Sequence, residues 1–168
     1  MSRRNRRAQA PPLPRPETRE LTVARVQDKY SEYPSNGLTP VRLAEIFREL
    51  DKPFISGLTV LGGEPFEPRN QRDLLPFLRE IRRRYPRKNI WCFTGFRLED
   101  ELLQDGSYPR CEVTDDLLRC IDILVDGRFL REEKDISLQF RGSRNQRIID
   151  LPRTLSSDRI VLWDQLRR

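Results

Sequence analysis

The sequence predicts an α/β fold built on a parallel sheet, and two observations support this prediction. Helical and strand patterns alternate three times between residues 40 and 127. Each strand candidate is a short apolar run followed by glycine. A short continuous apolar run is typical of a strand that is buried on both faces of a sheet. Strands that alternate with helices in this way lie parallel to one another.

The first helix is predicted at 40–51. Thr39 is a suitable N-cap, and Pro40 occupies the first helical position, where its missing N–H is not needed. Four apolar residues then recur at helical spacing: Leu43, Ile46, Phe47 and Leu50. The glycine-bounded run at 57–62 is predicted to be a buried strand, and residues 21–26 are predicted to form one short strand before the helix.

The later elements follow the same alternation, with the cations at 82–84 expected to be solvated at a helix C-terminus. Thr114 is the predicted N-cap of a short helix. In chain order the predicted elements are a helix at 70–85, a strand at 89–95, short helices at 97–104 and 114–120, a strand at 121–127 and a final strand within 140–152.

The N-terminal residues 1–20 are predicted to be a disordered basic tail. They contain six arginines and two glutamates, so they carry +4 of the net charge of +6. The 168 residues match about one domain, which we place at 21–168. Because the body has little excess charge, we do not expect it to bind nucleic acid. A nucleic-acid binder that uses the tail is the last of our hypotheses.

The composition excludes several kinds of chemistry. The chain has no histidine, which rules out Ser-His-Asp triads and histidine acid–base catalysis. Cys92, Cys111 and Cys120 are too widely spaced for a close-set metal motif. Single thiols in apolar stretches indicate a reduced, cytoplasmic protein. No apolar run is long enough to span a membrane, so no membrane partner is expected.

Three predicted strands end in glycine-containing polar segments, at 62–65 (GGEP), 93–96 (FTGF) and 125–129 (VDGRF). In parallel α/β sheets, ligands bind at this edge. Gly62 and Gly63 allow a ligand to approach the backbone. Glu64 could accept a hydrogen bond from an ammonium group, and Pro65 would fix the turn that follows.

The other two strand ends add Thr94, Asp126 and Arg128 to the candidate ligand-binding residues. Asp126 could bind hydroxyl groups, and Arg128 could bind a carboxylate through two hydrogen bonds. Together these groups fit a zwitterionic ligand that carries a ribose. The alternative is that each segment is only a tight turn, as glycine beside an acid often is.

Four stretches resemble the activating proteins of anaerobic ribonucleoside-triphosphate reductase, a family of radical S-adenosylmethionine enzymes. The resemblance runs from about residue 33 to residue 151. It rests on LTVLGGEPFEPRN, NIWCFTGF, IDILVDGRF and SLQFRGSRNQRIIDL, in this order. It implies an open, partial β/α barrel of parallel strands. It also implies that a 4Fe–4S cluster cleaves S-adenosylmethionine, and that the resulting 5′-deoxyadenosyl radical takes a hydrogen atom from a glycine of the partner reductase.

The resemblance also implies roles for individual residues. The GGEP backbone is similar to the segment that binds the methionyl amino group, and Asp126 matches an acid expected near the ribose. Arg128 stands where related proteins place a cation for the methionyl carboxylate. A later block, which either closes the ligand site or holds the end of the barrel, contains Arg141, Gly142, Ser143, Asn145 and Gln146.

One family feature is absent from the sequence. The family binds its cluster with a CxxxCxxC loop, but residues 1–91 contain no cysteine, and the first strand leading into that loop is not recognisable. We therefore predict neither a metal ligand nor a catalytic residue. Three explanations stay open: a fragment or mis-started reading frame, a ligand- or reductase-binding module without catalysis, or cysteines supplied by another chain. Residues 21–26 could cover the sheet edge left by the missing strand.

Overall fold

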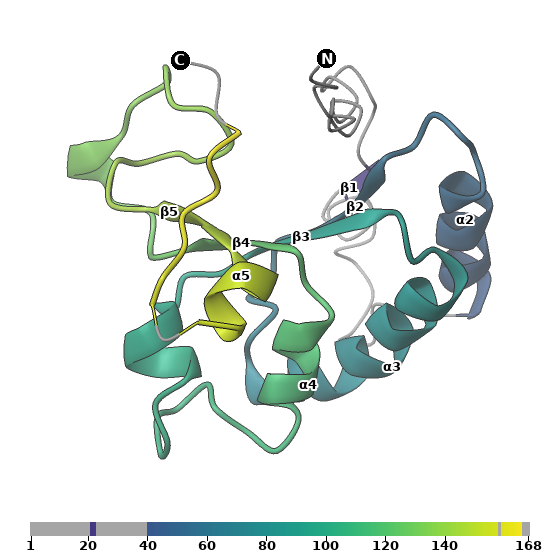
Figure 1. The fold of residues 1–168 in the computed structure, drawn as a ribbon, viewed down its shortest axis with the longest axis horizontal. Coiled ribbons are helices and arrows are strands. Elements are labelled where there is room, and N and C mark those ends of the chain that lie inside the picture. The colour runs from purple at the N-terminus through teal and green to yellow at the C-terminus, as the bar shows by residue number, and fades with distance from the viewer. Residues whose placement is uncertain (1–20, 23–39, 158, 166–168) are drawn as a thin grey trace, which may run out of the picture.

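The computed structural model describes residues 21–22, 40–157 and 159–165. The predicted tail at 1–20, the N-cap Thr39 and most of the predicted strand at 21–26 lie outside these residues. The described part is a five-stranded sheet with strands in chain order (Figure 1). The strands are β1 (Leu21–Thr22), β2 (Gly57–Val60), β3 (Asn89–Phe93), β4 (Ile123–Asp126) and β5 (Arg147–Asp150).

The sheet is mixed rather than fully parallel. Strands β1 to β4 are parallel, as predicted, and β1 pairs with the edge of β2. Strand β5 is antiparallel to β4. The connection 127–146 contains only one short 3-10 turn, η2 (Arg131–Glu133). Because a parallel neighbour needs a long crossover back to the other end of the sheet, a chain that stays at the same end must return antiparallel.

The predicted helices are present, with shifted ends and one different type. The helices are α2 (Pro40–Leu50), α3 (Pro68–Arg84), the π-helix η1 (Leu98–Leu102), α4 (Thr114–Arg119) and α5 (Leu151–Leu155). Helix α5 was not predicted. The prediction of Thr114 as an N-cap is wrong, because Val113 is the cap residue. Thr114 is buried within the helix instead, and its hydroxyl donates to Gln71 Oε1 at 2.7 Å.

The main core lies between one face of the sheet and the helices, which Figure 1 shows below and to the right of the strands. Alternate strand residues point into it, and the helices contribute the apolar residues of their inner faces. Its strand members are Leu58, Val60, Ile90, Cys92, Leu124 and Ile149. This face therefore anchors β2, β3 and β4, whose carboxyl ends carry the candidate site.

The opposite face of the sheet is covered by an aromatic cluster. The ring of Trp91, on β3, lies 5.0 Å from that of Trp163 and 5.2 Å from that of Phe140, measured between centroids. The C-terminal segment also pairs with β5, since the Trp163 N–H donates to the Ile148 carbonyl at 2.9 Å. This segment thus covers the outer edge of β5, which would otherwise expose unpaired backbone groups.

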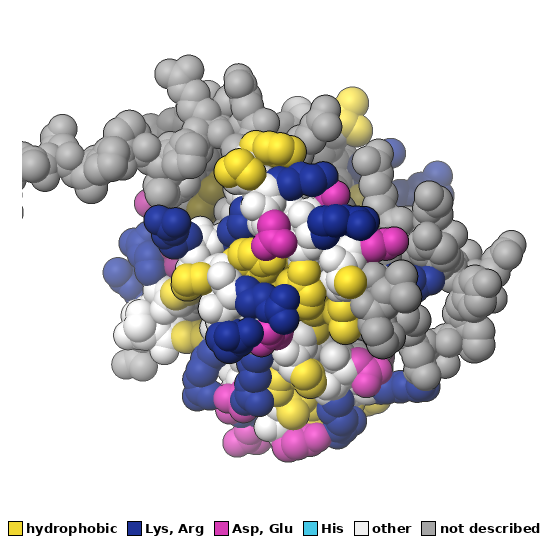
Figure 2. All heavy atoms as spheres, turned by 90° about the vertical axis from the view of Figure 1, so that its right-hand side faces the viewer, with side chains coloured by type: hydrophobic (Ala, Val, Ile, Leu, Met, Phe, Trp, Pro, Cys, Tyr) yellow, Lys and Arg dark blue, Asp and Glu magenta, His cyan; other side chains and the backbone are white. Residues whose placement is uncertain are grey.

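The surface beside α2 and α3 has mixed charge. Figure 2 shows basic, acidic and apolar side chains interspersed there, without a continuous basic patch. Arg83 and Arg84, from the run at 82–84, both form ion pairs with Glu80. Within the described residues, no helix combines the length and apolar character needed to cross a membrane.

Candidate ligand-binding site

The loop after β2 has an unusual backbone. Gly62, Gly63 and Glu64 follow one another in the left-handed region, with φ values of 83°, 58° and 37°. Glycine adopts this conformation freely, but a residue with a Cβ pays roughly 1–3 kcal/mol for it. Both glycines are exposed. The sequence GGEP therefore forms a tight left-handed turn whose backbone is open to solvent at the carboxyl edge of the sheet.

The carboxylate of Glu64 is held by the neighbouring strand end. Oε1 accepts hydrogen bonds from the Thr94 hydroxyl at 2.6 Å and from the Phe66 N–H at 3.0 Å. Oε2 accepts one from the Gly95 N–H at 2.8 Å. A carboxylate offers about four acceptor positions, so with the donors of the described residues one position is left for a further donor.

Asn70 fixes the same loop from the first turn of α3. Its side-chain amide donates to the carbonyls of Gly63 at 2.6 Å and Glu64 at 2.9 Å. Within the described residues, the N–H groups of Gly62, Gly63 and Glu64 have no acceptor. Sequence reasoning missed Asn70, although an amide side chain in the helical turn directly after a glycine pair was a usable signal.

Thr94 and Gly95 join the GGEP loop to the end of β4. Thr94 is buried, and its N–H donates to the Val125 carbonyl at 2.9 Å. A Cβ placed on Gly95 would lie 3.4 Å from Glu64 Oε2 and 3.7 Å from Cγ of Arg128. An acidic and a basic side chain thus both lie next to Gly95. Arg128 is exposed, and within the described residues its guanidinium has no partner.

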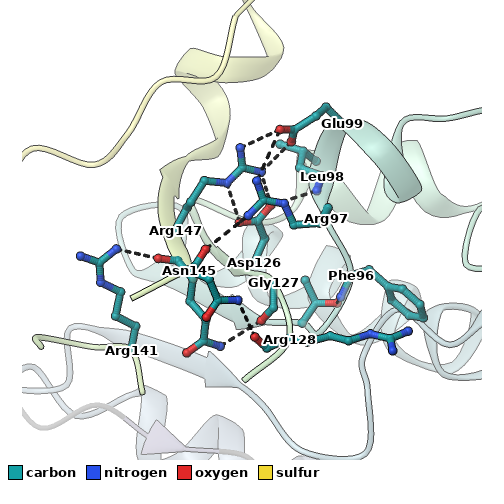
Figure 3. A network of polar contacts seen from close by, with 12 residues as sticks. Phe96, Arg97, Leu98, Glu99, Asp126, Gly127, Arg128, Arg141, Asn145 and Arg147 are labelled. Atoms are coloured by element: carbon teal, nitrogen blue, oxygen red, sulfur yellow. Dashed lines mark hydrogen bonds and ion pairs between the residues drawn. The ribbon is translucent and has the colours of Figure 1, made fainter. Parts of the chain in front are cut away.

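Asp126 has a different environment, which Figure 3 shows. It is completely buried, and Oδ2 accepts a hydrogen bond from the Leu98 N–H at 2.9 Å. Arg147 donates from Nε to Asp126 Oδ1 at 3.0 Å and binds Glu99 with two hydrogen bonds of 2.7 and 2.6 Å. Asp126 therefore has donors from within the protein, and its contact with a ligand hydroxyl stays a prediction.

The pKa values of Arg147 and Glu99 are shifted by the hydrogen bonds between Arg147, Asp126 and Glu99. Hydrogen bonds to Asp126 and Glu99 raise the pKa of Arg147, and the hydrogen bond from Arg147 lowers the pKa of Glu99. Sequence reasoning missed Arg147 and Glu99. The signal for Arg147 was its position as the first residue of the last strand, because antiparallel pairing sets it opposite Asp126.

The block at 141–146 holds the segment after β4. Ser143 is buried, and its hydroxyl donates to Asn145 Oδ1 at 2.7 Å. The Asn145 amide donates to the Arg128 carbonyl at 2.7 Å, and the Gln146 amide donates to the Gly127 carbonyl at 3.0 Å. These contacts tie the block to the segment after β4, and its two expected roles, closing the ligand site or holding the end of the barrel, stay predictions.

The guanidinium groups of Arg141 and Arg128 lie apart in the structure. Its Nη1 donates to the Gln146 carbonyl at 2.6 Å, and its Nε is buried without a partner in the described part of the chain. Figure 3 shows its guanidinium on the side of the block away from that of Arg128. The predicted role of Arg141 in ligand binding therefore stays a prediction, separate from the cluster of Glu64, Gly95 and Arg128.

The three cysteines of the chain all lie in the described residues, and they occupy three separate elements. Cys92 is buried in the middle of β3, Cys120 is buried at the end of α4, and Cys111 lies in the preceding loop. Among the described residues there is no group of three His, Cys, Asp or Glu side chains that could hold a metal ion.

Comparison with known proteins agrees with the resemblance seen in the sequence. Residues 26–149 match the family model described as a 4Fe-4S single cluster domain. Three similar proteins, each named anaerobic ribonucleoside-triphosphate reductase-activating protein, come from Haemophilus influenzae, Pasteurella multocida and Enterobacteria phage T4. Their identities to this chain are 41% over 90 residues, 39% over 105 and 32% over 106.

The aligned part is limited in each case. It covers 54%, 61% and 62% of this chain, and 52%, 62% and 59% of the three relatives. The chain therefore spans about half to three-fifths of the curated relatives it matches. No solved structure matches significantly. Because the family model covers residues 26–149, most of its length, the chain belongs to the 4Fe-4S single cluster domain family.

Proposed function

We propose that this chain acts in the activation of an anaerobic ribonucleoside-triphosphate reductase and binds S-adenosylmethionine at the carboxyl edge of β2, β3 and β4. The names of the relatives support the reductase as the partner. The left-handed turn at Gly62–Glu64 supports the ligand, because it combines exposed backbone with a fixed carboxylate. This turn is the observation that carries the proposal.

The side chains at this edge suit the methionyl end of the ligand. The open acceptor position on Glu64 can receive a hydrogen bond from the ammonium group. The guanidinium of Arg128, which has no partner among the described residues, belongs to a side chain that also lies next to Gly95 and can bind the carboxylate through two hydrogen bonds. A zwitterion bound between these two side chains leaves neither charge unpaired when water is displaced.

The cluster expected for the family does not fit the cysteines of this chain. In radical S-adenosylmethionine enzymes, the cluster and the ligand together supply the radical that oxidises a glycine of the partner. Such a cluster needs several thiolates in one cradle, and Cys92, Cys111 and Cys120 occupy three separate elements. We therefore assign to this chain the binding and orientation of the ligand. The alternative function, a module that only docks on the reductase, has the same support from the relatives.

We also propose that residues 21–168 form a single domain related to the open β/α barrel of radical S-adenosylmethionine enzymes. Four adjacent parallel strands with helices on one face support this. The three cysteines are all free, which supports a reducing compartment such as the cytoplasm.

Isothermal titration of the full chain with S-adenosylmethionine tests the proposed function, with and without prior treatment with iron and sulfide. In Gly63→Val we expect at least tenfold weaker binding, since the new side chain strains the turn and covers its backbone. Gly106→Val is the matched control. Gly106 also has a positive φ, of 79°, but nothing lies within 4 Å of its Cβ position. Equal binding by two folded variants would contradict the proposed ligand site.

A further inference from the structure

The family requires a cluster that the chain's own residues do not fit, and this disagreement has a functional consequence. We propose that this chain binds its zwitterionic nucleoside ligand without a 4Fe–4S cluster, through Glu64 and Arg128, whose side chains both lie next to Gly95. The inference rests on the proposed function, because it concerns how the same site holds S-adenosylmethionine.

Cys92 is unsuitable as an iron ligand. It lies in β3 between Trp91 and Phe93, and its side chain packs in the core between sheet and helices with 1% of the residue exposed. Iron is bound by the thiolate form, and burial raises the pKa of the Cys92 thiol. Binding iron there would require a charged group and a metal inside a packed apolar core, which is energetically prohibitive without rearrangement.

Cys120 and Cys111 do not form a cluster-binding site with Cys92. Cys120 lies just before β4, at the amino end of the sheet, whereas Glu64 and Gly95 lie at the carboxyl end. Cys111 is half-buried in the loop before α4, where its sulfur lies 3.7 Å from the Thr114 hydroxyl oxygen. The segments outside the described residues contain neither cysteine nor histidine, so they add no thiolate or imidazole ligand.

Without iron, the protein itself must compensate the charges of the ligand. Here Glu64 provides the negative charge, and its position is fixed by Thr94 and the Gly95 N–H. Arg128 provides the positive charge, and the Asn145 amide fixes its backbone carbonyl. Most of the affinity for the amino-acid end should therefore depend on these two side chains.

The first experiment measures iron and ligand binding together. The full chain is prepared anaerobically, treated with iron and sulfide, and analysed for both elements before titration with S-adenosylmethionine. We expect no stoichiometric iron and the same affinity before and after treatment. About four irons per chain, with binding only in the treated protein, would overturn this inference and leave the proposed function standing. No binding in either preparation would overturn the proposed function itself.

The second experiment uses a pair of ligands and a pair of variants. In Arg128→Gln, binding of S-adenosylmethionine should weaken at least tenfold. Binding of 5′-methylthioadenosine, which lacks the amino-acid end, should change less than twofold. Arg87→Gln is the control, because Arg87 is also exposed but precedes β3 at the opposite end of the sheet. Equal losses for both ligands, or no loss for either, would overturn the role of Arg128.

Discussion

The ends of β2 and β4 have similar sequences and different environments. Each brings glycine next to an acidic residue, Glu64 in one case and Asp126 in the other. Glu64 is half-buried, and its turn leaves three backbone N–H groups without acceptors in the described part of the chain. Asp126 is fully buried and ion-paired with Arg147. The end of β2 is thus an open region with exposed backbone, whereas the end of β4 is a region closed by the protein's own side chains.

The difference comes from where each acid lies relative to the strand. Asp126 is the last residue of β4 and points to the same side as Leu124, toward the helices. Glu64 lies beyond the end of β2, in a turn that brings its carboxylate across to β3. An acid beside glycine therefore does not by itself predict a ligand site. In these two cases, the acid within the strand is paired inside the fold, and the acid beyond the strand stays partly exposed.

The largest effect on stability is expected for the closed region. Asp126→Asn removes one charge of a buried pair, and such losses cost about 3–5 kcal/mol. Urea denaturation of wild type and Asp126→Asn would measure this loss in the free energy of unfolding. Asp116→Asn provides the control, because Asp116 and its partners Arg79 and Arg119 are all largely exposed, and such pairs contribute less than about 1 kcal/mol each. Equal losses in the two variants would mean that Asp126 is less important than its burial indicates.

A smaller loss is expected in the open region. Thr94→Val removes the hydroxyl that donates to Glu64 Oε1 and accepts from the Phe96 N–H. Leaving these partners unsatisfied should cost about 1–3 kcal/mol and weaken binding of S-adenosylmethionine. Thr94→Ser keeps the hydroxyl and should restore most of both properties. If Val and Ser behaved alike in denaturation and titration, the hydroxyl would not be what positions Glu64.

The sequence was sufficient to predict most of the elements but not the side-chain partners. Periodicity and glycine placement located α2, α3 and the strands from β2 to β4, because these signals are local. The antiparallel direction of β5 depends on the path of the connection 127–146, and the pairing of Asp126 with Arg147 depends on that direction. The left-handed conformation of Glu64 was also not predictable, since non-glycine residues rarely adopt it.

The smallest expected effect concerns Glu99, which is ion-paired with Arg147 beside Asp126, and this effect depends on pH. Arg147 lowers the pKa of Glu99 in the folded state. The stabilisation from this pair should be complete above the unfolded pKa of about 4.3. It should be lost as the pH falls through the lower folded pKa. With 38% of the Glu99 side chain exposed, the contribution should stay below about 1 kcal/mol. Denaturation of wild type and Glu99→Gln should therefore differ at pH 7, and the difference should shrink as the pH falls below about 4.3 and then through the lower folded pKa. A difference independent of pH would mean that Glu99 stabilises the protein by packing, and that Asp126 alone holds the charge of Arg147.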